Sequence, residues 1–441
     1  MKVDTLILGA GFSGLSLGYI FQKNSFVDYL ILEKESKPGG LCRSFKFLGT
    51  YYDIGAHALH KATYEKSKLL QEIIRKEEIY CQQRKAFVFL FGKVIPHPIQ
   101  CHMYYLPFRK RVRGLLSFLI SKHNRSKTTL KKWLESTLGK YICEIFLFPY
   151  NEKVWQINLN KISTEWTERI LSKPVRVLLG TFFPGVKNYS SNEFVCYPCQ
   201  GGFGRLLDKL IVVNKNKIHL NSEVTSIDLK SKTLILKNRQ KYYFKKLIST
   251  IPLDIFFVSI SDPKNQKIFK LSENLHKVSI CLVTFIIRKV KTDIQRVYIP
   301  EKKYFAQRVI INSNSSPSLK NHKYSVVSLE ISYLKMEHVK SRKTIVENSK
   351  KLLADLKLVN TKDDFIKTRI EYFKHAYPVQ TPNKNLILRQ IRKYLKIYQC
   401  YTLGRFGSWD YSNIDGIILN SQKLATKLLK FSSSRKFDTI S

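Results

Sequence analysis

A glycine-rich turn near the N-terminus constrains the fold of this chain more than any other feature of its sequence. The apolar residues 3–8 are typical of a buried first strand, and they run directly into Gly9-Ala10-Gly11-Phe12-Ser13-Gly14, a G-x-G-x-x-G motif. The first glycine of such a motif allows a tight turn, the second lets the backbone approach a pyrophosphate, and the third lets the helix pack closely on the strand. The pattern therefore predicts a Rossmann-like dinucleotide fold with the pyrophosphate at a helix N-terminus.

The next segments indicate which dinucleotide is bound. Glu33 ends a second apolar pair, where its carboxylate can accept hydrogen bonds from ribose hydroxyls. The segments 38–44 and 52–57 follow, and they resemble the G-G-x-x-R-S/T loop and the flavin-side loop of the amine-oxidase-like flavoproteins. The resemblance implies FAD, with Arg43 near the pyrophosphate and flavin and with His57 beside the flavin ring, where it helps to tune the reduced ring.

The balance of charge is extreme and limits the partners. The 441 residues include 76 Lys and Arg against 33 Asp and Glu, a net charge of +43, and they are enough for two or three structural units. The basic residues are spread along the whole chain, and no nucleic-acid-binding motif accompanies them. We predict no nucleic-acid partner and interpret most of the charge as a lysine-rich surface.

The cysteines and the apolar segments indicate the compartment. Only Cys196 and Cys199 form a C-x-x-C pair, and no second pair or histidine set completes a zinc site, so we predict half-buried thiols and no bound metal. The strand pattern begins at residue 3 without a preceding leader, and no apolar run reaches the roughly 18–20 residues that a membrane span needs. These features predict a cytoplasmic protein.

One segment carries a pattern that suits a membrane surface. Basic residues occupy positions 109–111 and 113, the apolar run 114–120 follows, and more basic residues lie between 122 and 127. Such a pattern fits a peripheral membrane helix or a core helix between basic loops. We favour the core helix and keep the peripheral contact as the alternative.

Strand and helix patterns occur in an order that is typical of an α/β protein. Residues 216–256 contain short strands, residues 277–335 are strand-rich, and residues 401–429 form a strand, a loop and a closing helix. The predicted units are a Rossmann-like FAD-binding domain assembled from residues 1–75, 195–275 and 385–441, a mainly helical substrate-binding subdomain over 76–194, and an antiparallel β-sheet subdomain over 276–384.

Five further blocks resemble one family, the UDP-galactopyranose mutases, most closely their eukaryotic-type branch and its bacterial relatives. The blocks lie at 94–107, 148–169, 192–204, 298–313 and 376–415, so with the first segments the resemblance covers almost the whole chain. The most specific are Pro149-Tyr150-Asn151-Glu152-Lys153-Val154-Trp155 and Gly404-Arg405-Phe406-Gly407-Ser408-Trp409-Asp410-Tyr411.

The resemblance implies a site for a nucleotide sugar. It places Arg169 and Arg308 on the diphosphate, whose oxygens match the planar guanidinium group, and it places Gln100 at the uridine end. The predicted substrate-binding residues are Gln100, Asn151, Trp155, Arg169, Asn192, Tyr298, Arg308, Tyr377 and Tyr411. The predicted cofactor-binding residues are Gly9, Gly11, Phe12, Ser13, Gly14, Glu33, Lys34, Gly40, Leu41, Arg43, Gly55, His57, Val224, Arg405 and Asp415. The predicted catalytic residues are His57, Arg169 and Arg308.

The reaction implied by the resemblance is redox-neutral. It interconverts UDP-galactopyranose and UDP-galactofuranose, or a close UDP-sugar pair, with reduced FAD as a covalent nucleophile at the anomeric carbon. NAD(P)H or another reductant would then have to reduce the flavin. The family further implies a role in the biosynthesis of cell-surface polysaccharides. A homo-oligomer stays open.

Departures from the family pattern leave the sugar open. Ala56 stands where the family usually has a glycine, His97 replaces a tyrosine, and Cys101 begins a pair that replaces two asparagines. Two alternatives stay open beside the isomerase. An FAD-dependent oxidoreductase of the amine-oxidase or protoporphyrinogen-oxidase type shares the first 60 residues without needing the diphosphate arginines. A non-catalytic protein of the membrane surface would keep FAD as a structural element.

Overall fold

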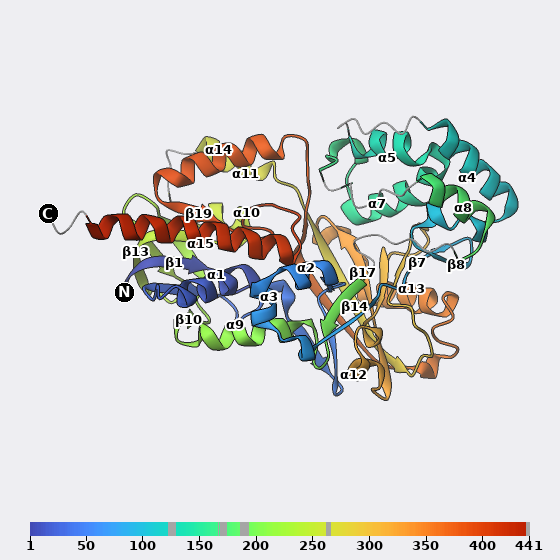
Figure 1. Ribbon diagram of the computed structural model, residues 1–441, viewed down its shortest axis with the longest axis horizontal. Helices are drawn as coiled ribbons and strands as arrows, with labels where there is room; N and C mark the ends of the chain where they lie inside the picture. The colour runs from blue at the N-terminus through green and yellow to red at the C-terminus, as the bar shows by residue number, and fades with distance from the viewer. Residues whose placement is uncertain (122–128, 166, 168–173, 186–193, 262–265, 438–441) are drawn as a thin grey trace.

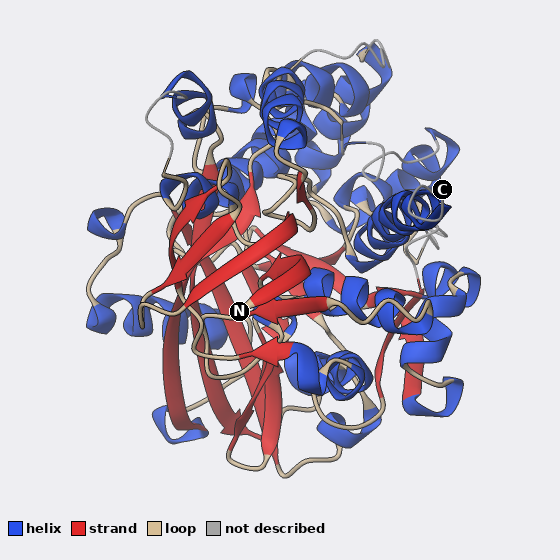
Figure 2. Ribbon diagram, turned by 90° about the vertical axis from the view of Figure 1, so that its left-hand side faces the viewer, coloured by secondary structure: helices blue, strands red, loops and turns tan. Residues whose placement is uncertain are grey.

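Two large sheets organise the molecule. The computed structural model describes residues 1–441 except 122–128, 166, 168–173, 186–193, 262–265 and 438–441. Each large sheet has seven strands, and helices surround them (Figures 1 and 2). The predicted fold class is confirmed: an α/β protein with a Rossmann-like domain built from separate segments, a helical part and an antiparallel sheet.

The first sheet is the nucleotide-binding one. Its path is β10 (Ile218–His219), β2 (Tyr29–Leu32), β1 (Lys2–Leu8), β13 (Lys241–Ser249), β12 (Thr233–Leu236) and β11 (Val224–Asp228), with β19 (Cys400–Thr402) also beside β13. Strands β10, β2, β1, β13 and β19 are parallel, whereas β12 and β11 are antiparallel. The strands that the sequence predicts at 218–236 and near 247 are confirmed.

Alternating side chains of β1 explain why helices cover both faces of this sheet. Ile7 belongs to the core on one face, whereas Leu6 and Leu8 belong to the core on the other. The first core includes α1 (Phe12–Lys23), α9 (Asp208–Val213) and α15 (Ile414–Phe437). The second core includes α10 (Leu253–Val258), α11 (Gln266–Glu273) and α14 (Lys384–Ile397).

The second sheet is antiparallel apart from one parallel pair. Its order is β18 (Phe365–Pro378), β14 (Lys277–Arg288), β17 (Tyr324–Tyr333), β16 (Arg308–Ile311), β15 (Arg296–Tyr298), β7 (Ala86–Leu90) and β8 (Lys93–Pro96). The parallel pair is β15 with β7, which brings residues 86–96 into this sheet although the predicted units group them with the helical part. The strands predicted at 278–287, 308–311 and 324–331 are confirmed. The edge strand β18 was not predicted, because its frequent charged residues interrupt the apolar pattern that is typical of a strand.

Smaller elements connect the two sheets. They include the pair β3 (Ser44–Phe47) and β4 (Thr50–Asp53), and the sheet β5 (Leu59–His60), β9 (Phe194–Pro198) and β6 (Ile79–Gln83). The short helices α2 (Lys61–Lys66), α3 (Lys68–Ile73) and α12 (Pro317–Lys320), and the longer α13 (Arg342–Asp355), lie outside the sheets.

A disulfide corrects the expectation that all cysteines are thiols. Cys81 of β6 and Cys196 of β9 stand directly opposite each other and form a disulfide. They are 115 residues apart, so only the pairing of the two strands brings them together. Cys199, the other half of the C-x-x-C pair, is a half-exposed thiol, and the described residues hold no cluster of metal ligands.

The helical part includes α4 (Phe108–Ile120), α5 (Leu130–Leu138), α6 (Lys140–Ile142), α7 (Phe148–Trp155) and α8 (Pro174–Phe182). The expectation of a core helix at 114–120 is wrong, because only Gly114 and Phe118 of α4 are buried. One face of α4 leaves apolar side chains in solvent, with Phe108 71% and Ile120 81% exposed. No helix in the described parts of the chain is long and apolar enough to span a bilayer.

Candidate active site

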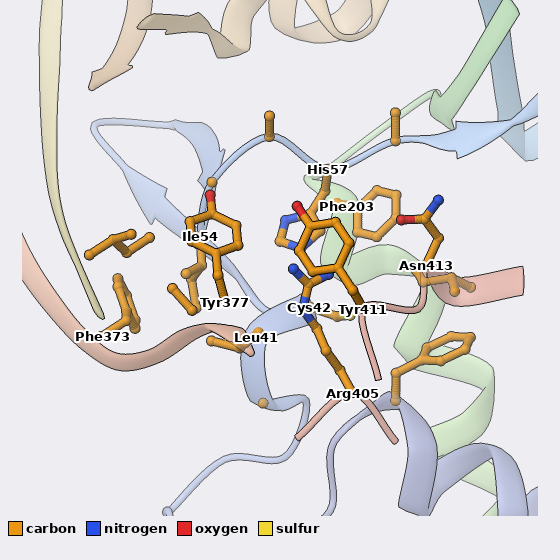
Figure 3. Close-up of a pocket in the computed structure, with 18 of the residues that line it drawn as sticks. Leu41, Cys42, Ile54, His57, Phe203, Phe373, Tyr377, Arg405, Tyr411 and Asn413 are labelled. Atoms are coloured by element: carbon orange, nitrogen blue, oxygen red, sulfur yellow. The ribbon is translucent and has the colours of Figure 1, made fainter. Parts of the chain in front are cut away.

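A large cavity runs from the first sheet to the second. Its volume is about 1460 Å³, above the usual range for one small ligand. Its walls come from the glycine motif, the segments around Arg43 and His57, the second sheet and the segment after β19. Figure 3 shows His57, Phe203, Tyr377, Arg405 and Tyr411 around one part of it.

The glycine motif forms a cradle at one end of the cavity. Gly9 has a φ of +98°, which favours glycine, and a Cβ on Gly14 would lie 2.1 Å from the Gly9 carbonyl oxygen. Gly11 has open space, because the nearest atom to a Cβ there is the Gly40 Cα at 3.9 Å. The positive φ of Gly9 forms the tight turn, and the missing side chain of Gly14 allows the helix to pack closely on it. The open space at Gly11 leaves room beside the backbone for a phosphate.

The helix behind this cradle is suited to an anion. α1 begins at Phe12 with Gly11 as its N-cap, no side chain caps it, and its first turn holds no acidic residue. Its N-terminal N–H groups and positive dipole end are therefore available to a pyrophosphate. The cavity is also lined here by the predicted residues Ser13, Lys34, Gly40, Leu41, Arg43 and Val224.

Glu33 holds the loop beside the cradle. Its carboxylate accepts hydrogen bonds from the Ala10 N–H at 2.8 Å and from the Glu35 N–H at 3.0 Å, and it still lines the cavity. These bonds leave further lone pairs for ribose hydroxyls. Asp415, in contrast, does not line the cavity in this structure: its Oδ2 accepts from the Thr63 hydroxyl at 3.4 Å.

His57 and Arg405 line the flavin side that the resemblance implies. The His57 ring stacks on Phe203 with the centroids 5.0 Å apart, and burial and Arg405 lower its pKa to about 4. His57 is therefore neutral near pH 7. The buried His57 Nδ1 and Arg405 Nε have no hydrogen-bond partner among the described residues, so they are available to a ligand. With the cradle, these groups fit FAD.

The second sheet supplies a row of polar groups on one face. Tyr298 is paired with Arg308, and Arg308 with Glu330, so the three side chains share the face that borders the cavity. The Arg308 guanidinium lies 3.7 Å from Glu330 and donates to the Tyr150 hydroxyl at 3.4 Å. Its Nε is buried without a partner among the described residues.

Glu330 is a central residue that the sequence analysis missed. It is fully buried, and it accepts hydrogen bonds from the Tyr377 hydroxyl at 2.7 Å and from the Ala56 N–H at 3.1 Å. Burial alone would raise its pKa, but Arg308, Tyr377 and other donors lower it below its ordinary value. Glu330 thus ties the His57 loop to the arginine. The signal in the sequence that could have identified Glu330 is that it is the single acidic residue within the mostly apolar strand 324–333.

Asn151 and Trp155, two of the predicted substrate-binding residues, lie behind the cavity wall. The Trp155 indole donates to the Asn151 side chain at 3.2 Å, and Asn151 donates to the Leu147 carbonyl at 2.8 Å. Trp155 packs against the rings of Tyr377 and Tyr411, both of which line the cavity. Gln100 lines the cavity directly. Arg169 and Asn192 lie outside the described residues, so their predicted contacts stay predictions.

Asp53 anchors the flavin-side loop. Its carboxylate accepts from the Ser44 hydroxyl at 2.5 Å, the Tyr197 hydroxyl at 2.7 Å and the Phe203 N–H at 3.0 Å. Burial outweighs these bonds and raises its pKa to about 6.

This raised pKa predicts a pH dependence of stability. Since the ordinary value is 3.8, the contribution of Asp53 to stability is full below pH 3.8 and is lost as the pH rises through about 6. We expect the difference in unfolding free energy between the wild type and Asp53→Asn to fall by about 3 kcal/mol over this window. Urea unfolding at several pH values measures it, and a difference that stays flat with pH would contradict the assignment.

Comparisons with known proteins agree with this geometry. The sequence profile of the family described as flavin containing amine oxidoreductase matches residues 12–293. A crystal structure of reduced UDP-galactopyranose mutase is similar with a TM-score of 0.89 at 22% identity, over 98% of this chain and 94% of that chain. A candidate protoporphyrinogen oxidase from Exiguobacterium sp. is similar at 0.76 and 15% identity, over 97% of this chain and 98% of the other. A CLA-producing fatty acid isomerase from P. acnes is similar at 0.65 and 13% identity, over 96% and 98%.

Proposed function

The chain belongs to the family of flavin-containing amine oxidoreductases and is an FAD-dependent enzyme, and from this premise we propose that it is a redox-neutral isomerase. Its reaction would interconvert UDP-galactopyranose and UDP-galactofuranose, or a close UDP-sugar pair.

The observation that carries the proposal is the row of cationic and phenolic groups opposite the FAD cradle. Arg308, Tyr298, Tyr377 and Tyr411 border the same cavity as His57 and Arg405. An anionic diphosphate suits such a wall, because guanidinium and phenol groups donate to phosphate oxygens. A cationic amine substrate would instead be repelled by these arginines.

The roles of the chain's own residues follow from this arrangement. Reduced FAD, when bound, would supply the nucleophile for the anomeric carbon. Arg308 and the phenols would hold the diphosphate while it leaves and until it returns. Neutral His57 would offer its unbonded ring nitrogen to the cofactor, and Glu330 would keep Arg308 and the His57 loop in place.

Anaerobic turnover tests the proposal. The protein is reduced with dithionite and incubated with UDP-galactofuranose, and UDP-galactopyranose is followed by chromatography. Conversion that requires the reduced flavin is expected. If the folded, reduced holoenzyme converts none, UDP-galactofuranose is not its substrate. If it also converts no other UDP-sugar, the isomerase is contradicted, and oxygen consumption with amine or porphyrinogen substrates would favour the oxidoreductase. NAD(P)H can be compared with dithionite as the reductant.

We propose that the protein attaches peripherally to anionic lipid. α4 is in contact with α8, and both helices carry exposed apolar side chains: Phe108, Val112, Leu116, Leu119 and Ile120 on α4, and Val175, Leu178, Leu179 and Phe182 on α8. Arg109 and Arg113 are exposed next to the α4 face, so the surface combines apolar area with positive charge. The two helices lie together at one end of the molecule (Figure 1).

Vesicle cosedimentation checks this attachment. We expect the wild type to sediment with vesicles of anionic lipid and the double variant Leu116→Glu and Ile120→Glu to lose at least tenfold in affinity, because two charges replace apolar contacts. Val258→Glu is the matched control, since Val258 is 86% exposed on α10, away from α4 and α8. If the double variant and Val258→Glu sediment equally with the vesicles, the proposal is contradicted. If the wild type self-associates and the double variant does not, the apolar face of α4 is instead the interface of a homo-oligomer.

A further inference from the structure

Two arginines of the cavity have no role in the function proposed above. Arg84 lies between β6 and β7, and Arg296 begins β15. Both line the cavity beside Arg308. No motif in the sequence marks either residue, because their segments are not neighbours along the chain.

Strand register places these arginines on one face. Arg296 is paired with Ala86, and Tyr298, two residues on, is paired with Arg308. Since side chains two residues apart point to the same face, Arg296, Tyr298 and Arg308 all face the cavity. Arg84 is two residues before Ala86 and reaches the same side from the end of the strand.

The positive charge of this group is not balanced within the described part of the chain. Glu330 forms an ion pair with Arg308, whereas neither Arg84 nor Arg296 has an ion pair among the described residues. The Nε atoms of Arg84, Arg296 and Arg308 are all buried and have no hydrogen-bond partner there. Because buried like charges without counter-charges are costly, such a group indicates a site for an anion.

The neighbouring titratable groups report the same excess of charge. Burial would raise the pKa of Tyr298, but Arg296, Arg308 and Arg84 lower it below its ordinary value. Burial, Arg84, His102 and Arg296 lower the pKa of His97 to about 3, so His97 adds no charge. Arg296 and Arg308 also help to lower the pKa of His57, so their charge acts on the flavin side of the cavity.

We infer that Arg84 and Arg296 form a second anion subsite, and that the substrate is a UDP-sugar whose glycosyl group carries a carboxylate. This inference rests on the proposed function, because that function assigns the diphosphate to Arg308 and leaves the glycosyl group between Arg308 and His57. A uronate carboxylate is planar and matches the guanidinium fork, so it would occupy the unbonded Nε edges. A neutral hexose would leave both arginines uncompensated.

Binding to the oxidised holoenzyme tests the inference without turnover. Calorimetry would compare UDP, UDP-galactose and UDP-galacturonic acid. We expect UDP-galacturonic acid to bind at least tenfold more tightly than UDP-galactose. Arg296→Gln and Arg84→Gln should each remove most of this preference while changing the affinity for UDP less than about twofold, and Arg296→Lys should keep part of it. Arg288→Gln is the matched control, since Arg288 is exposed at the end of β14.

Each other outcome has a defined meaning. Equal affinities for the two UDP-sugars would overturn the inference and leave the isomerase intact. A loss of UDP affinity in Arg296→Gln equal to the loss for the uronate would also overturn it, and would assign Arg296 to the diphosphate. If UDP itself does not bind to the wild type, the proposed function fails and this substrate class fails with it. The melting temperatures of the ligand-free variants should not fall, because each substitution removes an uncompensated charge.

Discussion

Replacing Arg308 by alanine is expected to lower the turnover of a UDP-sugar by roughly 100- to 1000-fold, about 3–4 kcal/mol of transition-state stabilisation. The guanidinium faces the cavity, and a methyl group cannot hold the charge of a departing diphosphate. Single-turnover kinetics with the reduced enzyme measure the effect. Bound FAD should remain, because Arg308 belongs to the second sheet and the cradle to the first.

The same substitution should also destabilise the fold, and this effect needs a control. Glu330 is fully buried, and its described ion pair is the one with Arg308. Its loss should cost about 3–5 kcal/mol of unfolding free energy, since an uncompensated charge is left behind. The double variant Arg308→Met and Glu330→Gln removes both charges and should regain most of the stability but none of the turnover. If turnover returned with stability, Arg308 would have a structural role only.

Gly14→Ala is expected to abolish FAD binding and to lower the unfolding free energy by roughly 3 kcal/mol. The added methyl group would lie 2.1 Å from the Gly9 carbonyl oxygen, and a backbone atom at this turn cannot move without opening the contact between α1 and β1. The flavin-to-protein ratio and thermal unfolding of the flavin-free protein measure both effects.

Gly11→Ala is the matched control within the same motif. A Cβ there meets the Gly40 Cα at 3.9 Å, an ordinary contact, so the flavin-free fold should keep its stability. FAD affinity should still fall at least tenfold, because the methyl group fills the room beside the pyrophosphate. Full FAD affinity in this variant would show that the pyrophosphate does not approach Gly11, and an unchanged stability of Gly14→Ala would contradict the close packing.

The pairing of distant strands decided features that the sequence left open. Glu330 meets Arg308 and the His57 loop because β16 pairs with β17, and Cys81 meets Cys196 because β6 pairs with β9. The exposure of α4 likewise depends on which neighbours cover it, and a pattern of apolar residues does not specify them.

The sequence by itself determined the nucleotide cradle and the fold class. Gly9, Gly11 and Gly14 lie in one strand–turn–helix unit, where steric limits on the backbone act over a few residues, and Glu33 directly follows the next strand, so their spacing can be recognised in the sequence. The tertiary structure alone decided that Arg84 and Arg296 join Arg308 at the cavity, because the three arginines come from separate segments that meet only through strand register. Steric limits on the backbone depend on residues that are close together in the sequence, whereas the charge around a cavity depends on how the strands of the whole sheet pair.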